Sequence, residues 1–258
     1  MDIIARAFKD KKSLVVFITG GDPNIETTAK LIPAIAEAGA DLIEIGIPFS
    51  DPVAEGPVIQ AASERALASG TTTDKLFEMV ARVNRQVQIP LLFMTYLNPI
   101  YAYGKERFLT ACRDTGIAGI IVPDMPFEEK GDLSEECTKF EIDLVSMVAP
   151  TSHERIAMIA KEAEGFLYCV SSLGVTGVRS QIHADIEKVV AQAKKFTDVP
   201  CAIGFGISNP VQAKNMARFA DGVIVGSAIV NIIGEHGRNC IEPVKKFVKT
   251  MKEAIENE

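Results

Sequence analysis

The sequence predicts an α/β protein built as a (β/α)8 TIM barrel with a short extra N-terminal helix. Three observations lead to this fold. Eight short runs rich in β-branched residues recur along the 258 residues, and a helical pattern follows each run. Most runs are continuously apolar rather than alternating, which is typical of parallel strands covered on both faces.

The elements can be placed from their apolar periodicity. Residues 25–40 bring Leu31, Ile32 and Ile35 to one helical face and end beside Gly39, which suits the position after a helix C-terminus. The opening stretch MDIIARAFKDKK has the pattern of a short amphipathic helix. The eight predicted strands are 13–19, 41–47, 89–96, 119–123, 143–148, 165–171, 200–206 and 222–227.

An open doubly wound sheet is the alternative fold. It is less favoured because no glycine-rich fingerprint follows the first strand. No linker, low-complexity tract or composition shift marks a boundary, so we expect a single domain over residues 1–258.

The composition narrows the class of function. An apolar fraction of 47% and a charged fraction of 24% are ordinary for a soluble globular protein. The net charge of −7 argues against a nucleic-acid or anionic-membrane partner. There is neither an apolar run of 18 residues nor a signal-peptide core, and the five cysteines contain no C-x-x-C, so a cytoplasmic protein with reduced thiols is expected. The three histidines do not pair at i, i+4, and no metal site is expected.

Three glycine-containing loops follow late strands: SSLGVTG (171–177), GFGIS (204–208) and GSAIV (226–230). Glycine lets backbone N–H groups approach an anion, and the following helix adds the positive end of its dipole. Barrels often bind phosphate with the loops after strands 7 and 8. We therefore favour a phosphate site made by Gly177, Gly206, Gly226 and Ser227 over simple tight turns.

Glu44 is the most unusual residue of the predicted strands. It lies between Ile43 and Ile45, so its side chain points away from theirs, either into the barrel or into the helix layer. Either place is poor in water, where a carboxyl has a raised pKa and can exchange protons near neutrality. A structural glutamate paired with an arginine is the competing interpretation.

Other residues near the carboxyl ends of the strands are weaker candidates. Asp51 stands before a proline and Glu55 lies in the same loop, so both read first as loop residues. Asp124 could hold a loop in place. The aromatic residues Phe17, Phe93 and Tyr168 could form a pocket, although each is more often a core residue.

Several of these motifs together resemble the α subunit of tryptophan synthase. They cover nearly the whole chain in the order of that family, and the stretch around 44–57 is its most specific part. The motifs are FITGGDP (17–23), DLIEIGIPFSDPVAEGP (41–57), MTYLNPI (94–100), IVPDMP (121–126), YCVSSLGVTG (168–177), GFGIS (204–208) and GSAIV (226–230).

The resemblance implies a lyase that cleaves indole-3-glycerol phosphate into indole and glyceraldehyde 3-phosphate without metal or organic cofactor. Glu44 matches the acid–base carboxylate of the family, and Glu55 stands where a second carboxylate faces the indole nitrogen. The implied indole pocket is formed by Phe17, Phe93 and Tyr168. Thr176 would meet the second carboxylate when the loops after strands 2 and 6 close over the substrate.

One position departs from the family pattern. The family has Asp where this chain has Glu55, so the carboxylate arm is longer by one methylene group. A misplacement of about 1 Å can cost on the order of a hundredfold in rate. We expect the loop to accommodate the longer arm. The alternative is a weakly catalytic phosphate-binding barrel that acts mainly as a regulator of its partner.

The resemblance also implies the partner, a PLP-dependent tryptophan synthase β subunit in an α2β2 heterotetramer. The rather apolar stretch 96–104 and the loop of Asp51 would form the docking surface. A free-standing, indole-releasing relative that works without the β subunit is possible. Another phosphate-binding barrel enzyme ranks lower, because no catalytic Lys or His is well placed at a strand end.

Overall fold

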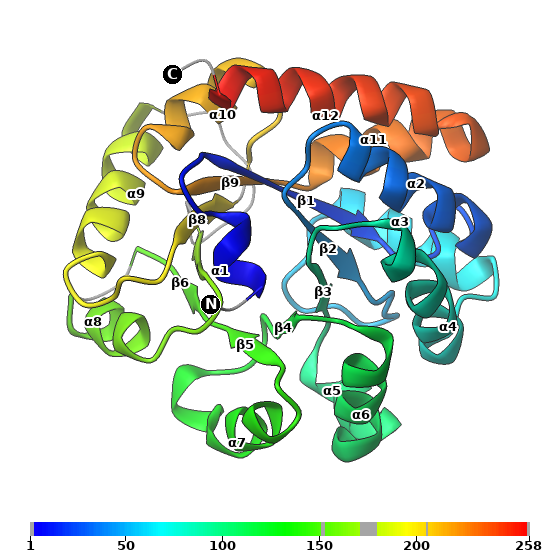
Figure 1. Ribbon diagram of the computed structural model, residues 1–258, viewed down its shortest axis with the longest axis horizontal. Coiled ribbons are helices and arrows are strands. Elements are labelled where there is room, and N and C mark those ends of the chain that lie inside the picture. Colours follow the sequence, from blue (N-terminus) through cyan, green and yellow to red (C-terminus); the bar gives the residue numbers. More distant parts are fainter. Residues whose placement is uncertain (1–2, 151–152, 171–179, 205, 257–258) are drawn as a thin grey trace.

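The computed structural model describes residues 3–150, 153–170, 180–204 and 206–256. Within these residues, nine parallel strands form one sheet with the order β5-β4-β3-β2-β1-β9-β8-β7-β6. The helices surround the sheet, and the view down the ring shows the strands curling around a centre (Figure 1). The predicted (β/α)8 barrel with a short N-terminal helix is confirmed.

β1 coincides with its predicted range, the range 143–148 contains two strands, and each other predicted range contains one strand that is two to four residues shorter. The strands are β1 Ser13–Thr19, β2 Leu42–Gly46, β3 Leu91–Met94, β4 Gly119–Ile121, β5 Asp143–Val145, β6 Met147–Val148, β7 Leu167–Val170, β8 Cys201–Gly204 and β9 Gly222–Val225. The helices are α1 Ile3–Ala7, α2 Ile25–Glu37, α3 Pro57–Ala68, α4 Thr73–Val83, α5 Leu97–Tyr103, α6 Lys105–Thr115, α7 Gly131–Lys139, α8 His153–Lys161, α9 Ser180–Ala193, α10 Pro210–Ala217, α11 Ser227–His236 and α12 Ile241–Glu256. Three 3-10 turns accompany them, η1 Asn84–Gln86, η2 Phe127–Glu129 and η3 Gly237–Asn239.

The fifth barrel strand is divided in two. The sequence predicts one strand over 143–148, whereas the structure interrupts it at Ser146. β5 pairs with β4, and β6 pairs with β7. The carbonyl of Ser146 itself accepts a hydrogen bond of 3.0 Å from the backbone N–H of Tyr168. The same segment therefore turns its pairing from one neighbour to the other, and this closes the ring.

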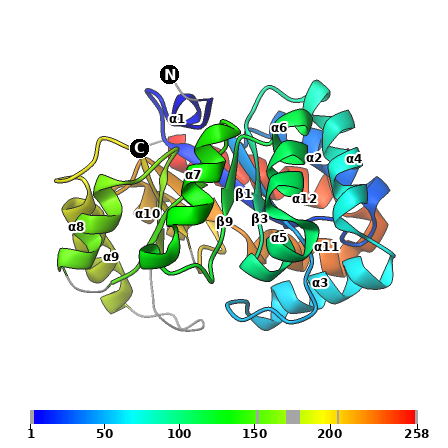
Figure 2. The same cartoon turned by 90° about the horizontal axis from the view of Figure 1, so that it is seen from below.

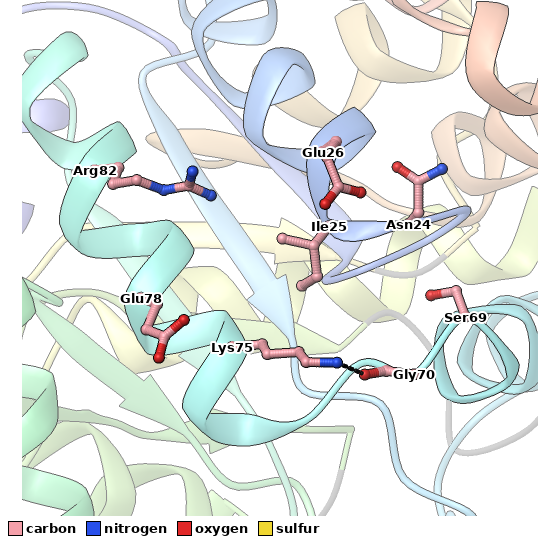
Figure 3. A pocket seen from close by; sticks show the side chains of 8 residues that line it. All are labelled: Asn24, Ile25, Glu26, Ser69, Gly70, Lys75, Glu78 and Arg82. Carbon is pink, nitrogen blue, oxygen red and sulfur yellow. Dashed lines mark hydrogen bonds between the residues drawn. The ribbon is translucent and has the colours of Figure 1, made fainter.

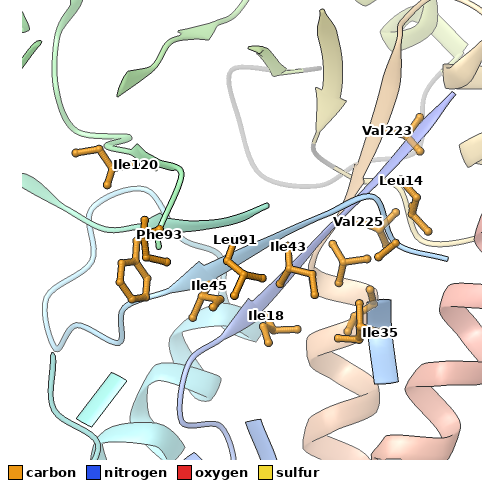
Figure 4. Packing of buried hydrophobic residues seen from close by; sticks show 14 of the residues in the cluster. Leu14, Ile18, Ile35, Ile43, Ile45, Leu91, Phe93, Ile120, Val223 and Val225 are labelled. Atoms are coloured by element: carbon orange, nitrogen blue, oxygen red, sulfur yellow. The ribbon is translucent and has the colours of Figure 1, made fainter. Parts of the chain in front are cut away.

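Alternation along the strands separates two apolar layers. Leu14, Val16 and Ile18 of β1 belong to the outer cluster between strands and helices, which Figure 4 shows in part. Val15, between them, faces the inside of the barrel. The inner cluster takes one residue from each position around the ring: Val15, Leu42, Leu92, Ile121, Val145, Tyr168, Ala202 and Ile224. The lumen is thus a packed core and not a pore.

Helix α1 closes the N-terminal end of the barrel. Ile4, Ala7 and Phe8 join the inner cluster, and the ring of Phe8 lies 5.5 Å from that of Phe166. Ile3, the first residue of α1, remains 53% exposed. Figure 2 shows α1 at one end of the molecule and α3 at the opposite end. Helix α1 therefore covers the end of the lumen at which the strands begin.

Helix α12 is fixed to the same closed end by a buried ion cluster. The ammonium of Lys252 donates to Asp41 at 2.8 Å and to the carbonyl of Lys12 at 3.1 Å. The Asp41 carboxylate also accepts from the backbone N–H of Leu14 at 2.8 Å and pairs with Lys11. This cluster joins the last helix to β1 and to the start of β2.

A substitution of Phe93 tests the packing between the strands and the helices. Phe93 is fully buried, and its ring packs edge-on against Phe77 at 5.3 Å and near Phe108 at 6.4 Å. Replacing it by alanine leaves a cavity in this layer, so Phe93→Ala should lower the free energy of unfolding by about 3–5 kcal/mol. Urea unfolding measures the loss, with Tyr101→Ala as control because Tyr101 is 54% exposed. Equal losses in the two variants would contradict the described packing.

Candidate active site

Glu44 points into the lumen of the barrel. Its neighbours Ile43 and Ile45 belong to the outer cluster, and Leu42, on the same face as Glu44, belongs to the inner one. The side chain is fully buried, and neither carboxyl oxygen has a hydrogen-bond partner among the described residues. The choice that the sequence leaves open, lumen or helix layer, is settled in favour of the lumen.

Burial controls the chemistry of this carboxyl. Loss of water disfavours the charged form and raises the pKa of Glu44 from 4.5 to about 8. Burial also raises the pKa of Tyr168 well above its ordinary value, and the nearby charge of Glu44 adds to the effect. Near neutrality Glu44 is mainly protonated, and a modest change in its surroundings allows it to lose the proton, which suits both acid and base catalysis.

Three glycines make room for two aromatic rings beside Glu44. A Cβ at Gly46 would lie 2.7 Å from the ring of Phe17, and one at Gly226 would lie 3.3 Å from the Phe17 Cβ. A Cβ at Gly204 would lie 2.5 Å from the hydroxyl of Tyr168. The two rings therefore occupy space that side chains on neighbouring strands would otherwise fill. Both rings lie on the inner face of the barrel, and their part in an apolar pocket stays a prediction.

Phe93 does not belong to this pocket, and here the sequence-based expectation needs correction. Phe93 pairs in register with Ile45 and faces the helices, because residues 92 and 94 take the inward positions of β3. Met94 is the residue that packs with Phe17 on the inner side. Strand alternation alone gives two possible faces, so the sequence did not identify Met94.

Glu55 lies in the loop before α3 and is held by Tyr96. Its side chain is half-buried, and burial raises the pKa of Glu55 while a hydrogen bond with Tyr96 lowers it. The Tyr96 hydroxyl also accepts from the backbone N–H of Ala54 at 3.2 Å, and the Tyr96 ring contacts Phe49 at 5.7 Å. Burial, then the Glu55 charge, raises the pKa of Tyr96 to about 12. One oxygen of Glu55 is buried without a partner among the described residues.

Tyr96 is thus a functional candidate that the sequence analysis missed, although it lies in a quoted motif. The structure records no direct contact between Glu44 and Glu55 within the described ranges. The hydroxyls of Thr19 and Thr95, at the carboxyl ends of β1 and β3, are also buried without a partner there. Thr19 lies on the inward face of β1 with Val15, so its unpaired hydroxyl is suited to hydrogen-bond a ligand, whereas alternation puts Thr95 on the outward face with Phe93.

Asp124 has the structural role suggested by its position. Its carboxylate accepts from the backbone N–H of Leu97 at 3.0 and 3.3 Å, at the first residue of α5. This contact joins the segment after β4 to the segment after β3. Asp51 is exposed and bonds to the neighbouring Ser50, which agrees with a loop residue.

The described part of the predicted phosphate site lies at the ends of two paired strands. Gly206 follows β8 and has a φ of +80°, and a Cβ there would have no neighbour within 4 Å among the described residues. Gly226 follows β9, and Ser227 is the first residue of α11, whose initial N–H groups have no partners within the helix. The predicted contributions of Gly177 and Thr176 lie outside the described residues.

Three further observations concern metal binding, a surface cavity and membrane insertion. No group of three or more His, Cys, Asp or Glu side chains within the described ranges could hold a metal ion. The surface cavity of about 400 Å³ between α2 and α4 is a different place: its lining includes Lys75, Glu78 and Arg82 and none of the predicted site residues (Figure 3). No described helix has the length and apolar character required to span a membrane.

The fold and the site together define a (β/α)8-barrel protein with a buried carboxyl of raised pKa on the inner face of the barrel. The family model described as tryptophan synthase alpha chain matches residues 4–256. The chain belongs to the tryptophan synthase alpha chain family.

Individual relatives agree with this assignment. The tryptophan synthase alpha chain of Lacticaseibacillus casei is 44% identical over 256 residues, which is 99% of this chain and 96% of the relative. The tryptophan synthase alpha chain of Thermoanaerobacter sp. is 47% identical over 247 residues, which is 95% of this chain and 94% of the relative. Among solved structures, tryptophan synthase subunit alpha from Legionella pneumophila has a TM-score of 0.91 at 36% identity, with both chains fully covered.

The raised pKa of Glu44 has a consequence for stability. Between the ordinary pKa of 4.5 and the folded value of about 8, the unfolded chain has lost this proton while the folded protein keeps it. The folded state therefore loses stability as the pH rises through this window, by roughly 5 kcal/mol at about 1.36 kcal/mol per pH unit. Glu44→Gln removes this loss, so urea unfolding should show the variant gaining stability relative to the parent from pH 5 to pH 8. A constant difference would contradict the placement of the carboxyl.

Proposed function

We propose that this protein catalyses the α reaction of tryptophan synthase, the retro-aldol cleavage of indole-3-glycerol phosphate into indole and glyceraldehyde 3-phosphate in tryptophan biosynthesis. The observation that carries the proposal is Glu44, a carboxyl with a raised pKa and two unpaired oxygens inside the barrel mouth. Membership of the family supports the choice of substrate. The class of enzyme is a carbon–carbon lyase.

Glu44 can serve both proton transfers of this reaction. In its acid form it gives a proton to C3 of the indole ring. The carboxylate so produced accepts the proton of the glycerol hydroxyl next to the ring. As that O–H bond breaks, its electron pair forms the aldehyde, and the electrons of the broken carbon–carbon bond return to the ring. The net result is one proton moved from oxygen to carbon, and the scheme calls on no metal ion or organic cofactor.

Glu55 would stabilise the charge that forms between these two transfers. When C3 is protonated, positive charge appears at the ring N–H, and a nearby carboxylate lowers the energy of that state. The contact with Tyr96 supports this role, because it holds the loop of Glu55 against the barrel end. The rings of Phe17 and Tyr168, with Met94, would enclose the indole.

The glycerol phosphate would lie over the ends of β8 and β9. Gly206 and Gly226 leave backbone groups accessible, and Ser227 opens α11, whose dipole favours an anion. Gly177 would complete the phosphate site. Thr176 would meet Glu55 when the loops close, as the family resemblance suggests.

We also propose that the barrel works with a PLP-dependent tryptophan synthase β subunit as an α2β2 heterotetramer in the cytoplasm. The docking face would lie at the open end of the barrel. Val53, 76% exposed in the Glu55 loop, and Tyr101, 54% exposed on α5, give this face an apolar character. One chain of a solved tryptophan synthase of M. tuberculosis matches this protein with a TM-score of 0.88 and 27% sequence identity.

The function is tested by supplying indole-3-glycerol phosphate to the purified protein and following indole. The parent should release indole, and Glu44→Gln should lower kcat by about 10²–10⁴-fold, because amide cannot exchange the proton. Indole release should also decline above pH 8, as the acid form of Glu44 is lost. Absence of indole from the parent, with and without a β subunit, would reject the function.

The length of the Glu55 arm gives a second test. Shortening it by one methylene draws the carboxylate away from Tyr96, so Glu55→Asp should lower kcat by about tenfold with a smaller change in KM. Steady-state kinetics with Asp51→Glu as a loop control measures this. A rise of several tens-fold in Glu55→Asp would instead indicate that the native protein is a weakly catalytic binding module.

A further inference from the structure

Arg65 and Asp22 form a two-pronged ion pair at the catalytic end of the barrel. The guanidinium donates from Nε to Oδ1 of Asp22 at 2.8 Å and from Nη2 to Oδ2 at 2.7 Å. The Asp22 side chain is fully buried, whereas that of Arg65 is 37% exposed. Asp22 lies in the loop after β1, three residues beyond Thr19. The pair therefore joins that loop to α3.

The same guanidinium also lies on α11. A Cβ at Gly234 would come within 3.2–3.4 Å of three guanidinium atoms of Arg65, so the flat group packs over this glycine. Helix α11 starts at Ser227, at the proposed phosphate site. One side chain thus touches α11 and the loop after β1 while it belongs to α3.

Helix α3 connects this contact to the site. It begins at Pro57, two residues after Glu55, and Arg65 lies in its last half. Its first turns pack on the pocket, because Ala62 forms a buried cluster with Phe17 of β1 and Val230 of α11. A rigid helix fixed at Arg65 therefore sets where the loop of Glu55 ends.

We propose that Arg65 is a positioning residue that acts through Glu55: its two hydrogen bonds to Asp22 and its packing over Gly234 hold α3 in place, and α3 fixes the end of the Glu55 loop. This inference rests on the proposed function. The geometry needs arginine, because lysine can hold one oxygen of a carboxylate but not both in a set plane. A buried ion pair contributes little net stability compared with well-packed apolar residues, so orientation is the better explanation for it.

The test is a double-mutant cycle on kcat for indole release. Arg65→Lys keeps a cation opposite Asp22 but loses the fork, and should lower kcat about tenfold with KM changed by less than about threefold. Glu55→Gln in the parent should lower kcat about a hundredfold. In the Arg65→Lys protein the same change should cost only about tenfold, because Glu55 is already misplaced.

A second variant covers the case in which lysine restores the fork through a water molecule. Arg65→Met combined with Asp22→Asn removes both charges and leaves no unpaired buried carboxylate. It should show the same reduced effect of Glu55→Gln. Arg107→Met is the matched control, since Arg107 pairs with Asp74 on the exposed outside of the barrel at 3.0 Å. In that background Glu55→Gln should keep its full effect.

The outcomes separate the two proposals. If the parent releases no indole, the proposed function fails. If the parent is active and the effect of Glu55→Gln on kcat is unchanged in both Arg65 backgrounds, the positioning role is wrong. A lower midpoint of thermal unfolding in the Arg65 variants would then show that Arg65 only supports the fold. A reduced effect in either background, with the control unchanged, supports positioning.

Discussion

The rest of the site depends on a carboxyl group kept inside an apolar barrel without a partner. Strand alternation sets the direction of the Glu44 side chain. Because Ile43 and Ile45 pack against the helices, Glu44 must point into the lumen. The packed inner layer below it, sealed by α1, keeps water out from that side. An unpaired charge there would be costly, so the group is held mainly as the neutral acid. The folded state therefore gives up stability to keep this carboxyl buried.

The two ends of the barrel differ in how their polar groups are treated. At the closed end, Asp41 is fully engaged by Lys252, Lys11 and the backbone of Leu14. At the open end, the hydroxyls of Thr19 and Thr95 and the carboxyl of Glu44 have no partner among the described residues. Satisfied groups stabilise a structure, whereas unsatisfied ones are available to a ligand. We interpret Asp41 as a structural group and Glu44 as a group available to a ligand.

The sequence predicted the order of elements well because continuous apolar runs and helical periodicity are local signals. All eight strands and the N-terminal helix were found, and only the division at Ser146 was not anticipated, since it depends on pairing with two different neighbours. The site was predicted less completely. Phe93 was placed on the wrong face because a run with apolar residues at every position does not say which face is inner. Tyr96 holds the loop of Glu55 from 41 positions farther along the chain, and no local pattern reports such contacts.

The two aromatic rings of the proposed indole pocket are backed by main chain. Where Phe17 and Tyr168 lie, the space is created by absent side chains at Gly46, Gly204 and Gly226, so the main chain itself sets the limit. Neither ring can therefore move back to enlarge the space in front of it. A designer who wished to admit a bulkier ring system would have to work on the remaining sides, where Met94 and the α3 residues Val58 and Ile59 supply removable atoms.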